Sequence, residues 1–226
     1  MRTVLLVFGG ISLLVALALL IGGGALLALN TALADSEGFI TTKSRQLEGD
    51  SYAIVFQHIN INLGEAVGEW GVWRPSPGDF VTIKITGFSN DPSKKVFIGI
   101  AEASDVEAYL TDVSYDEITN SSFLPSGSFD VEYESHPGDA VPSDPNSQMF
   151  WTVSEHGAGT QTLKWSPETG SYWIVLMNED GSSGVDLTVS LGAKVPLIFT
   201  IGLALFAGGV IALIIGVALI YAGIRG

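Results

Sequence analysis

Long runs of apolar residues lie near both ends of the chain, and the segment between them is polar. Residues 4–29 and 195–224 contain no charged residue. About 20 helical residues at roughly 1.5 Å each cross the ~30 Å hydrocarbon core of a bilayer. Both runs exceed this length, so each predicts a transmembrane helix. We therefore divide the chain into an N-terminal transmembrane segment (1–34), a central domain (35–194) and a C-terminal transmembrane segment (195–226).

The first apolar run also has features of a signal peptide. Arg2 precedes it, and Ala32-Leu33-Ala34 fits an A-x-A cleavage site. The apolar region of a signal peptide has only about 7–15 residues, however, and this run is roughly twice as long. We interpret residues 1–34 as an uncleaved signal anchor.

Small residues recur at intervals of seven within both apolar runs. They are Gly9, Ala16 and Gly23 in the first run and Gly202, Gly209, Gly216 and Gly223 in the second. A seven-residue repeat stays close to one face of a helix, and small side chains let helix backbones approach closely in lipid. The pattern predicts a helix-packing seam. Its partner is either the other helix of an antiparallel hairpin or another subunit.

The central domain contains short runs of β-branched and aromatic residues separated by turn residues. Residues 80–86 and 184–191 alternate between apolar and polar side chains, which is typical of strands that bury one face. Turn-forming sequences at residues 90–93 and 178–181 separate neighbouring strands. The pattern predicts a mainly β domain, an antiparallel sandwich or jelly-roll-like fold. Strands are expected at residues 39–42, 52–58, 80–88, 95–101, 149–154, 160–165, 171–177 and 184–191.

One short helix is expected inside this domain. Ser104-Asp105-Val106-Glu107 fits a capping box, in which the serine oxygen and the glutamate each satisfy a main-chain N–H at the start of a helix. The helix would continue to about Leu110. Residues 111–148 have no strong periodicity and predict a long loop with one strand near residues 129–133.

The charge of the chain is strongly negative. It has 24 Asp and Glu against 10 Lys and Arg, for a net charge of −14. All 24 acids but only 8 basic residues lie in residues 35–194, so the central domain carries −16. Nucleic-acid binding requires clustered basic residues, and no nucleic-acid partner is expected. The absence of cysteine from the sequence excludes disulfides and thiol chemistry.

Half of these acids fall in one stretch. Residues 96–163 contain 12 acids and no Lys or Arg. Carboxylates on loops supply the hard oxygen ligands that Ca²⁺ prefers, although no EF-hand spacing is present. The favoured interpretation is a solvated acidic surface, with a bound cation or a basic partner as alternatives; no other cofactor is expected. The candidate metal ligands are Asp112, Asp116, Glu117, Asp139 and Asp144.

Aromatic and histidine residues supply the remaining candidates for chemistry. Trp70 and Trp73, in an expected loop, could stack on a sugar ring or anchor the domain at lipid headgroups. The more economical interpretation is packing or anchoring. The histidines have no HExxH spacing and the chain has no G-x-S-x-G elbow, so no catalytic residues are assigned.

The central and C-terminal parts resemble a group of uncharacterised prokaryotic two-span membrane proteins. The resemblance begins at residues 96–110 and continues at Phe150-Trp151, residues 157–165, residues 170–173 and residues 175–181. It covers about half of the chain, and its motifs are structural. The resemblance implies a membrane-tethered extracytoplasmic β-domain and lends no catalytic residues.

These observations together predict a two-pass membrane protein. Arg2 and Arg225 favour the cytoplasm for both termini, which places the central domain on the extracytoplasmic side. The expected role is a non-enzymatic accessory or scaffold subunit. Its helices would pack in the lipid bilayer, and its acidic domain would engage a membrane-protein partner or a second copy of the chain. The alternative is a cell-envelope module that binds calcium or glycan; a hydrolase using acidic residues is least favoured.

Overall fold

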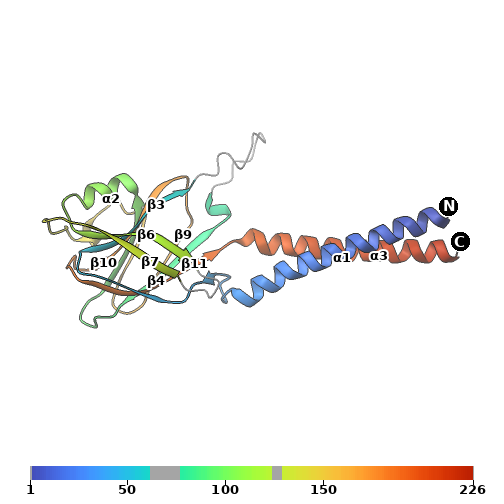
Figure 1. The fold of residues 1–226 in the computed structure, drawn as a ribbon, viewed down its shortest axis with the longest axis horizontal. Helices are drawn as coiled ribbons and strands as arrows, with labels where there is room; N and C mark the ends of the chain where they lie inside the picture. Colours follow the sequence, from blue (N-terminus) through green and yellow to red (C-terminus); the bar gives the residue numbers. More distant parts are fainter. Residues whose placement is uncertain (1, 62–76, 124–128, 226) are drawn as a thin grey trace. The chain divides into compact units, whose positions relative to one another are not determined.

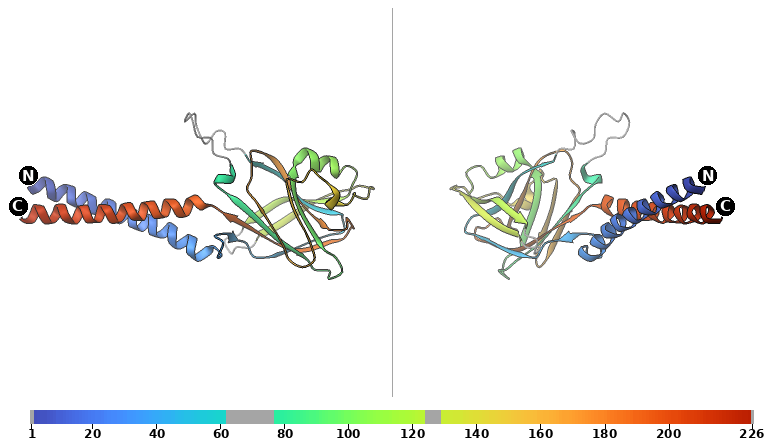
Figure 2. Two further views of the ribbon diagram at one scale, coloured as in Figure 1. Left: turned by 180° about the vertical axis from the view of Figure 1, so that it is seen from behind. Right: turned by 45° about the vertical axis from the view of Figure 1, so that its right-hand side comes forward.

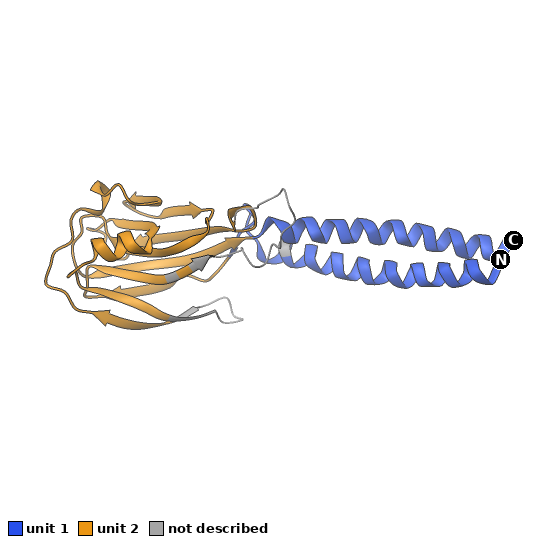
Figure 3. Cartoon of the chain, turned by 90° about the horizontal axis from the view of Figure 1, so that it is seen from above, with its two compact units in different colours: residues 1–40, 195–226 blue, residues 41–194 orange. Residues whose placement is uncertain are grey.

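The computed structural model describes residues 2–61, 77–123 and 129–225 (Figure 1). The chain divides into two compact units, which Figure 3 colours separately. Residues 1–40 and 195–226 form the first unit, and residues 41–194 form the second. Each unit is described below by itself.

The first unit is a hairpin of two long helices, α1 (Arg2–Leu33) and α3 (Pro196–Arg225). The helices run antiparallel, because Gly9 of α1 lies against Ile220 while Gly23 lies against Gly202. The start of α1 and the end of α3 therefore lie at the same end of the hairpin, as Figure 2 shows. Both helices are long and apolar enough to cross a membrane.

The second unit consists of two β-sheets with one short helix, α2 (Ala103–Tyr109). One sheet has the order β1-β11-β4-β9, with β2 also paired to β11, and the other has the order β7-β6-β3-β10-β5-β8. The strands are β1 (Ile40–Thr41), β2 (Arg45–Gly49), β3 (Ala53–Ile61), β4 (Thr82–Ser89), β5 (Val96–Glu102), β6 (Tyr115–Phe123), β7 (Phe129–His136), β8 (Val153–Gly157), β9 (Gln161–Trp165), β10 (Gly170–Asn178) and β11 (Val185–Lys194). Short 3-10 turns occupy Pro77–Asp79 and Pro145–Ser147.

The main core lies between the two sheets. Strand β11 shows why: Val185, Leu187 and Val189 are fully buried while the residues between them are partly exposed, so one face of the strand packs inward. From the other sheet, Leu176 and Ile98 enter the same cluster. The sandwich predicted from the alternating pattern is confirmed.

A second apolar cluster covers the outer face of the six-stranded sheet. Val175 and Met177 of β10 point to this side, and Val106 of α2 packs over them. Strand β10 is consequently buried on both faces from Tyr172 to Asn178. A strand buried on both faces carries a continuous apolar run, and the sequence of β10 has one.

Four expectations about strands need correction. The strand predicted near residues 129–133 is confirmed as β7, but the loop predicted around it at residues 111–148 also contains β6, and the two strands form one end of the six-stranded sheet. Among the residues of β6 whose burial is described, Ile118 alone enters the main core, and the sequence of β6 lacks the apolar alternation that marks a strand. The sheet is also mixed, since β6 pairs in parallel with β3. Strand β2 was missed, and β8 begins at Val153 rather than at residue 149.

The predicted capping box is also wrong. The N-cap of α2 is Glu102, which makes no side-chain capping bond, and Ser104 lies inside the helix. The reason is that β5 stays paired with β10 as far as Glu102, opposite Tyr172. The chain passes directly from this strand into the helix, so the register of the sheet determines where α2 begins.

Candidate functional site

The seam between α1 and α3 is built from the small residues of the heptad pattern. All seven of them are buried: Gly9, Ala16, Gly23, Gly202, Gly209, Gly216 and Gly223. A Cβ atom on Gly23 would lie 2.5 Å from the main-chain nitrogen of Phe206 and 2.8 Å from the carbonyl oxygen of Gly202. Contacts with main chain cannot be relieved by rotating a side chain. Glycine therefore permits the close approach of the two helices.

A hydrogen bond also joins the two helices. The hydroxyl of Ser12 on α1 donates to the carbonyl oxygen of Ala212 on α3 at 2.8 Å. The hydroxyl of Thr200, by contrast, donates to Pro196 within its own helix at 3.3 Å. The seven-residue pattern did not mark Ser12, because the residue is polar and lies out of phase with the glycines.

The outward faces of the hairpin are apolar. Leu14 is 70% exposed and Ile214 is 64% exposed, and neither helix contains an acidic residue. Large apolar side chains on this scale are costly to leave in water, at about 25 cal/mol per Å² of surface. The arrangement is suited to a hydrocarbon environment.

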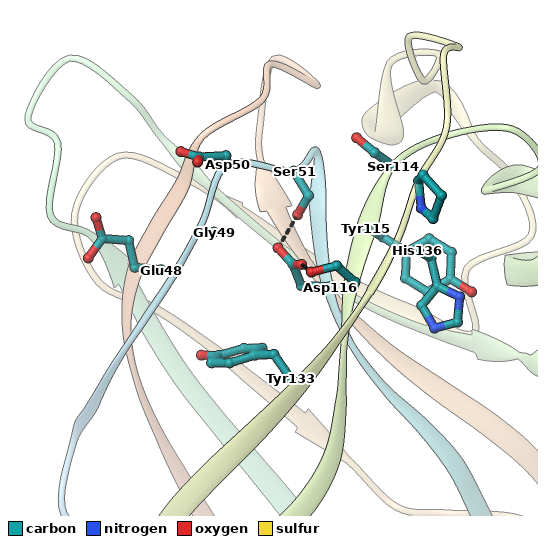
Figure 4. Close-up of a pocket in the computed structure, with 11 residues that line it drawn as sticks. Glu48, Gly49, Asp50, Ser51, Ser114, Tyr115, Asp116, Tyr133 and His136 are labelled. Carbon is teal, nitrogen blue, oxygen red and sulfur yellow. Dashed lines mark hydrogen bonds between the residues drawn. The ribbon is translucent and has the colours of Figure 1, made fainter.

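A pocket of about 710 Å³ opens at one end of the β-sandwich (Figure 4). Three chain segments form it: the turn from β2 into β3, the first residues of β6, and the last residues of β7. Strands β6 and β7 pair antiparallel with Asp116 opposite Ser135 and Ile118 opposite Tyr133. Because side chains alternate along a strand, these four residues share the face that points between the sheets.

Asp116 lies at the centre of the pocket and is 9% exposed. One carboxylate oxygen, Oδ2, accepts a hydrogen bond from the Ser51 hydroxyl at 2.7 Å, and the other, Oδ1, accepts from the Ser135 hydroxyl at 2.5 Å. Figure 4 shows the bond between Ser51 and Asp116 as a dashed line. Within the described part of the chain, no Lys or Arg forms an ion pair with Asp116. The two hydroxyls hold the carboxylate in place without neutralising it.

Gly49 makes room for this carboxylate. A Cβ atom at Gly49 would collide with Oδ2 of Asp116 and would lie 3.5 Å from the hydroxyl of Ser51. The main chain at the end of β2 therefore passes directly over the carboxyl group. Any side chain at this position would displace Asp116.

Tyr133 forms another wall of the pocket and is 39% exposed. Burial raises the pKa of its phenol, and the nearby Asp116 and Glu48 carboxylates add to this rise, while Arg45 and a hydrogen bond from the main chain of Glu48 oppose it. The phenol is consequently neutral at physiological pH, and its ring is available beside an acidic group. Glu48 and Asp50, both exposed, line the mouth of the pocket.

A second group borders the pocket at Tyr115. The rings of Tyr115 and His136 stack with centroids 4.4 Å apart and planes at 11°. Nε2 of His136 lies 2.8 Å from a carboxylate oxygen of Glu117. Burial raises the pKa of Tyr115, and the carboxylate of Glu117 contributes to the rise. This arrangement fixes the ring of His136 at the rim.

The five candidate metal ligands do not gather into one metal-binding group in the structure. Asp116 and Glu117 are adjacent on a strand and point to opposite faces, since Asp116 contacts Ser135 and Glu117 contacts His136. Asp112 adopts a positive φ of 60°. Residues 2–61, 77–123 and 129–225 contain no group of three or more His, Asp or Glu side chains placed to hold a metal ion.

Of the other two candidates, Asp139 precedes Ala140, whose main-chain nitrogen donates to the carbonyl oxygen of Asp112 at 2.8 Å. Asp144 accepts a hydrogen bond from the main-chain nitrogen of Asn146 at 2.8 Å and so caps the 3-10 turn that follows it. Asp139 is exposed. Calcium binding stays a prediction, and the sequence argument grouped these residues by spacing along the chain rather than by proximity in the fold. Trp70 and Trp73 lie outside the described residues.

Sequence reasoning missed most of the pocket. Ser51 and Ser135 lie outside the predicted strands, whereas Tyr133 lies at the end of the strand predicted near residues 129–133. A polar residue adjacent to an acid in a short strand is a weak signal by itself. Only the pairing of β6 with β7 and β3 brings Asp116 to both serines.

Comparisons with known proteins add little to this description. No protein-family model matches the chain, and no curated protein matches it. Two similar solved structures are the mitogen of Yersinia pseudotuberculosis and CorA, a surface-associated copper-binding protein of Methylomicrobium album. The mitogen is 10% identical, with 70% of this chain and 85% of that chain covered and a TM-score of 0.22. CorA is 12% identical, with 72% of this chain and 96% of that chain covered and a TM-score of 0.26. These TM-scores are too low for either likeness to indicate the fold or the function of this chain.

Proposed function

We propose that this chain is a non-enzymatic, membrane-anchored accessory or scaffold subunit. Helices α1 and α3 cross the bilayer as a hairpin with both termini in the cytoplasm. The acidic β-domain lies on the extracytoplasmic side and engages a protein partner there. Arg2 and Arg225 at the ends of the hairpin support this orientation, since basic residues favour the cytoplasmic side.

The burial pattern of the hairpin carries this proposal. Its buried residues are glycines and one alanine, while large apolar residues such as Leu14 and Ile214 are exposed. A soluble helical hairpin buries its large apolar side chains. The reversed pattern is the one expected for helices whose surroundings are lipid.

The closed seam also indicates which part meets the partner. The glycines of α1 and α3 contact each other's helix, so the seam is occupied within one chain. A partner in the membrane would therefore contact the outward faces of the hairpin. The strongly acidic domain, at a net charge of −16, is the more distinctive surface and is where we expect recognition.

Cross-linking mass spectrometry on native membranes at native abundance tests this proposal. We expect reproducible cross-links from the β-domain to one neighbouring protein or to a second copy of the chain. An amine-directed reagent has lysines to use in this domain, including Lys94, Lys95 and Lys164. If the protein is always a lone monomer with no cross-linked neighbour, in membranes and in mild detergent, the subunit proposal fails.

A further inference from the structure

We propose that the pocket at the end of the sandwich binds a basic side chain of the partner, the guanidinium of an arginine or the ammonium of a lysine. This inference rests on the proposed function, because it names the chemical group that the partner presents to the acidic domain. The pocket is defined by Asp116, Ser51, Ser135, Tyr133, Glu48 and Asp50.

The buried, hydrogen-bonded carboxylate of Asp116 is the main support for this proposal. The residue is 9% exposed, and its partners among the described residues are the hydroxyls of Ser51 and Ser135. Burying a carboxylate is costly unless a positive charge compensates for the lost hydration. The described part of the chain supplies hydrogen bonds to this group but no ion-pair partner. A cation entering the pocket would form an ion pair with this carboxylate.

The walls of the pocket suit an organic cation. The exposed acids Glu48 and Asp50 line the mouth, where they raise the local concentration of positive groups. The half-exposed ring of Tyr133 lies beside Asp116 on the neighbouring strand, as Figure 4 shows. The face of a tyrosine ring attracts a guanidinium or ammonium group by a cation–π interaction.

The same geometry argues against a bare metal ion as the occupant. Calcium requires six to eight oxygen ligands, roughly 2.3–2.6 Å from the ion. The described residues contain no such group of carboxylates or histidines. The volume of about 710 Å³ is instead within the range of pockets that hold an organic group. Arginine fits the acidic walls well, because its planar guanidinium carries five N–H donors.

Gly49 allows a second, independent test of the pocket. Its missing side chain lets the carboxylate of Asp116 occupy its present position. The substitution Gly49→Ala keeps every charge of the pocket and displaces this carboxylate. A loss of binding in this variant would show that the position of the carboxylate matters, and not the charge of the domain alone.

The test is a titration of the full-length protein in nanodiscs of uncharged lipid, at low ionic strength. The probe is acetyl-Gly-Arg-Gly-amide, and the same peptide with citrulline in place of arginine is the uncharged control. Spermidine forms a third arm, which distinguishes a protein side chain from a free polyamine. Binding is measured by calorimetry for the wild type and the variants Asp116→Asn, Gly49→Ala and Asp105→Asn.

Asp105→Asn is the matched control, because Asp105 is an exposed acid on α2 outside the pocket and its loss changes the net charge equally. We expect the arginine peptide to bind and the citrulline peptide to bind at least tenfold more weakly. Asp116→Asn and Gly49→Ala should each weaken arginine binding at least fivefold, and Asp105→Asn less than twofold. If Asp116→Asn does not fold, the pair Glu48→Gln and Asp50→Asn replaces it, with a smaller expected loss.

Several results would overturn the inference. Equal binding of the citrulline peptide would exclude recognition of the charge. Equal weakening by Asp105→Asn and Asp116→Asn would mean that the domain attracts cations diffusely. If spermidine binds and the arginine peptide does not, a protein side chain is excluded as the occupant. The subunit proposal is tested separately, because cross-linked neighbours with no peptide binding would reject only the pocket.

Discussion

The helical hairpin and the β-domain bury opposite kinds of residue. In α1 and α3 the buried positions are glycine and alanine, and leucine, isoleucine, valine and phenylalanine form the outer surface. In the β-domain Leu47, Ile98 and Leu176 are fully buried, and acids occupy the surface. The same chain therefore follows two packing rules, and the difference supports the proposal that the hairpin packs in lipid while the β-domain packs in water.

The physical reason lies in what drives each unit to pack. In water the removal of apolar surface stabilises a core of large side chains. In lipid that driving force is absent, so helices associate through close backbone contact, which small residues permit, and through interhelical hydrogen bonds. The hairpin contains both features, at Gly23 and at Ser12.

The largest expected effect is a loss of stability when a large side chain is removed from the core of the β-domain. Leu176→Ala removes a fully buried side chain from the core between the sheets. It should lower the free energy of unfolding of the domain by about 2–5 kcal/mol. Ile214→Ala, which truncates an exposed residue of α3, should change it by less than about 0.5 kcal/mol. Urea titration of both variants in detergent, followed by tryptophan fluorescence, checks this; equal losses would contradict the comparison.

The next effect concerns the seam. Gly23→Leu places a large side chain against the main chain of Phe206 and Gly202, whereas Gly22→Leu is its matched control because nothing lies within 4 Å of a Cβ there. The first variant should increase the separation of the helices by about 2 Å, the spread that contact side chains produce in interaxial distances. The control should leave it unchanged.

The absence of cysteine makes this measurement direct. Spin labels on Ile21→Cys and Leu203→Cys, both exposed positions, report the distance between the helices by pulsed electron paramagnetic resonance. A shift of the same size in Gly22→Leu would show that added bulk anywhere on α1 moves the helices. The contact at Gly23 would then not be what determines the distance between the helices.

A smaller effect is expected at the hydrogen bond between the helices. Ser12→Ala removes the bond to the carbonyl of Ala212 and should destabilise the hairpin by about 0.6 kcal/mol. Thr200→Ala removes a hydroxyl that bonds within its own helix and serves as the control. The spin-label distance distribution should broaden in the first variant only. Equal broadening in both would assign the effect to the lost hydroxyl itself.

The smallest expected effect is a pH-dependent change in stability that occurs in the β-domain and not in the hairpin. Hydrogen bonds from Ser182, through its side chain and its main chain, lower the pKa of Asp180 below the usual 3.8. A lowered pKa stabilises the folded domain above that value, and the contribution is lost as the pH falls through the pKa of the folded state. Asp180→Asn should therefore be less stable than the wild type at neutral pH.

The difference between the two proteins should disappear as the pH falls below 3.8. Melting temperatures of the β-domain across this range check the prediction. The spin-label distance in the hairpin should not change over the same range, because α1 and α3 contain no acid. A constant difference between wild type and Asp180→Asn at all pH values would contradict the assignment.

The sequence was most informative where one solvent acts on a long segment. Two uncharged runs and a seven-residue repeat predict the two helices, and the alternation at residues 184–191 predicts β11. Both patterns reflect a repeating contact with one environment. The strand predicted near residues 129–133 is β7, whereas its partner β6 was not predicted, because among the residues of β6 whose burial is described Ile118 alone joins the main core.

The pocket was hidden for a related reason. Asp116 was a candidate ligand, but its partners Ser51 and Ser135 are 65 and 19 residues away along the chain. The parallel pairing of β3 with β6 brings the first of them close, and local composition does not encode such a pairing. The start of α2 was misplaced similarly, because the pairing of β5 with β10 overrides the local capping signal.

The most direct test of the central claim, that the hairpin crosses a bilayer, is cysteine accessibility in liposomes. Leu14→Cys and Ile214→Cys lie on the outside of the hairpin, at 70% and 64% exposure, so the protein itself cannot shield them. Glu155→Cys is an exposed reference on the β-domain. We expect a water-soluble maleimide to label the reference rapidly and to leave both hairpin cysteines unlabelled until the protein is denatured. Labelling of all three at similar rates in intact liposomes would contradict the claim.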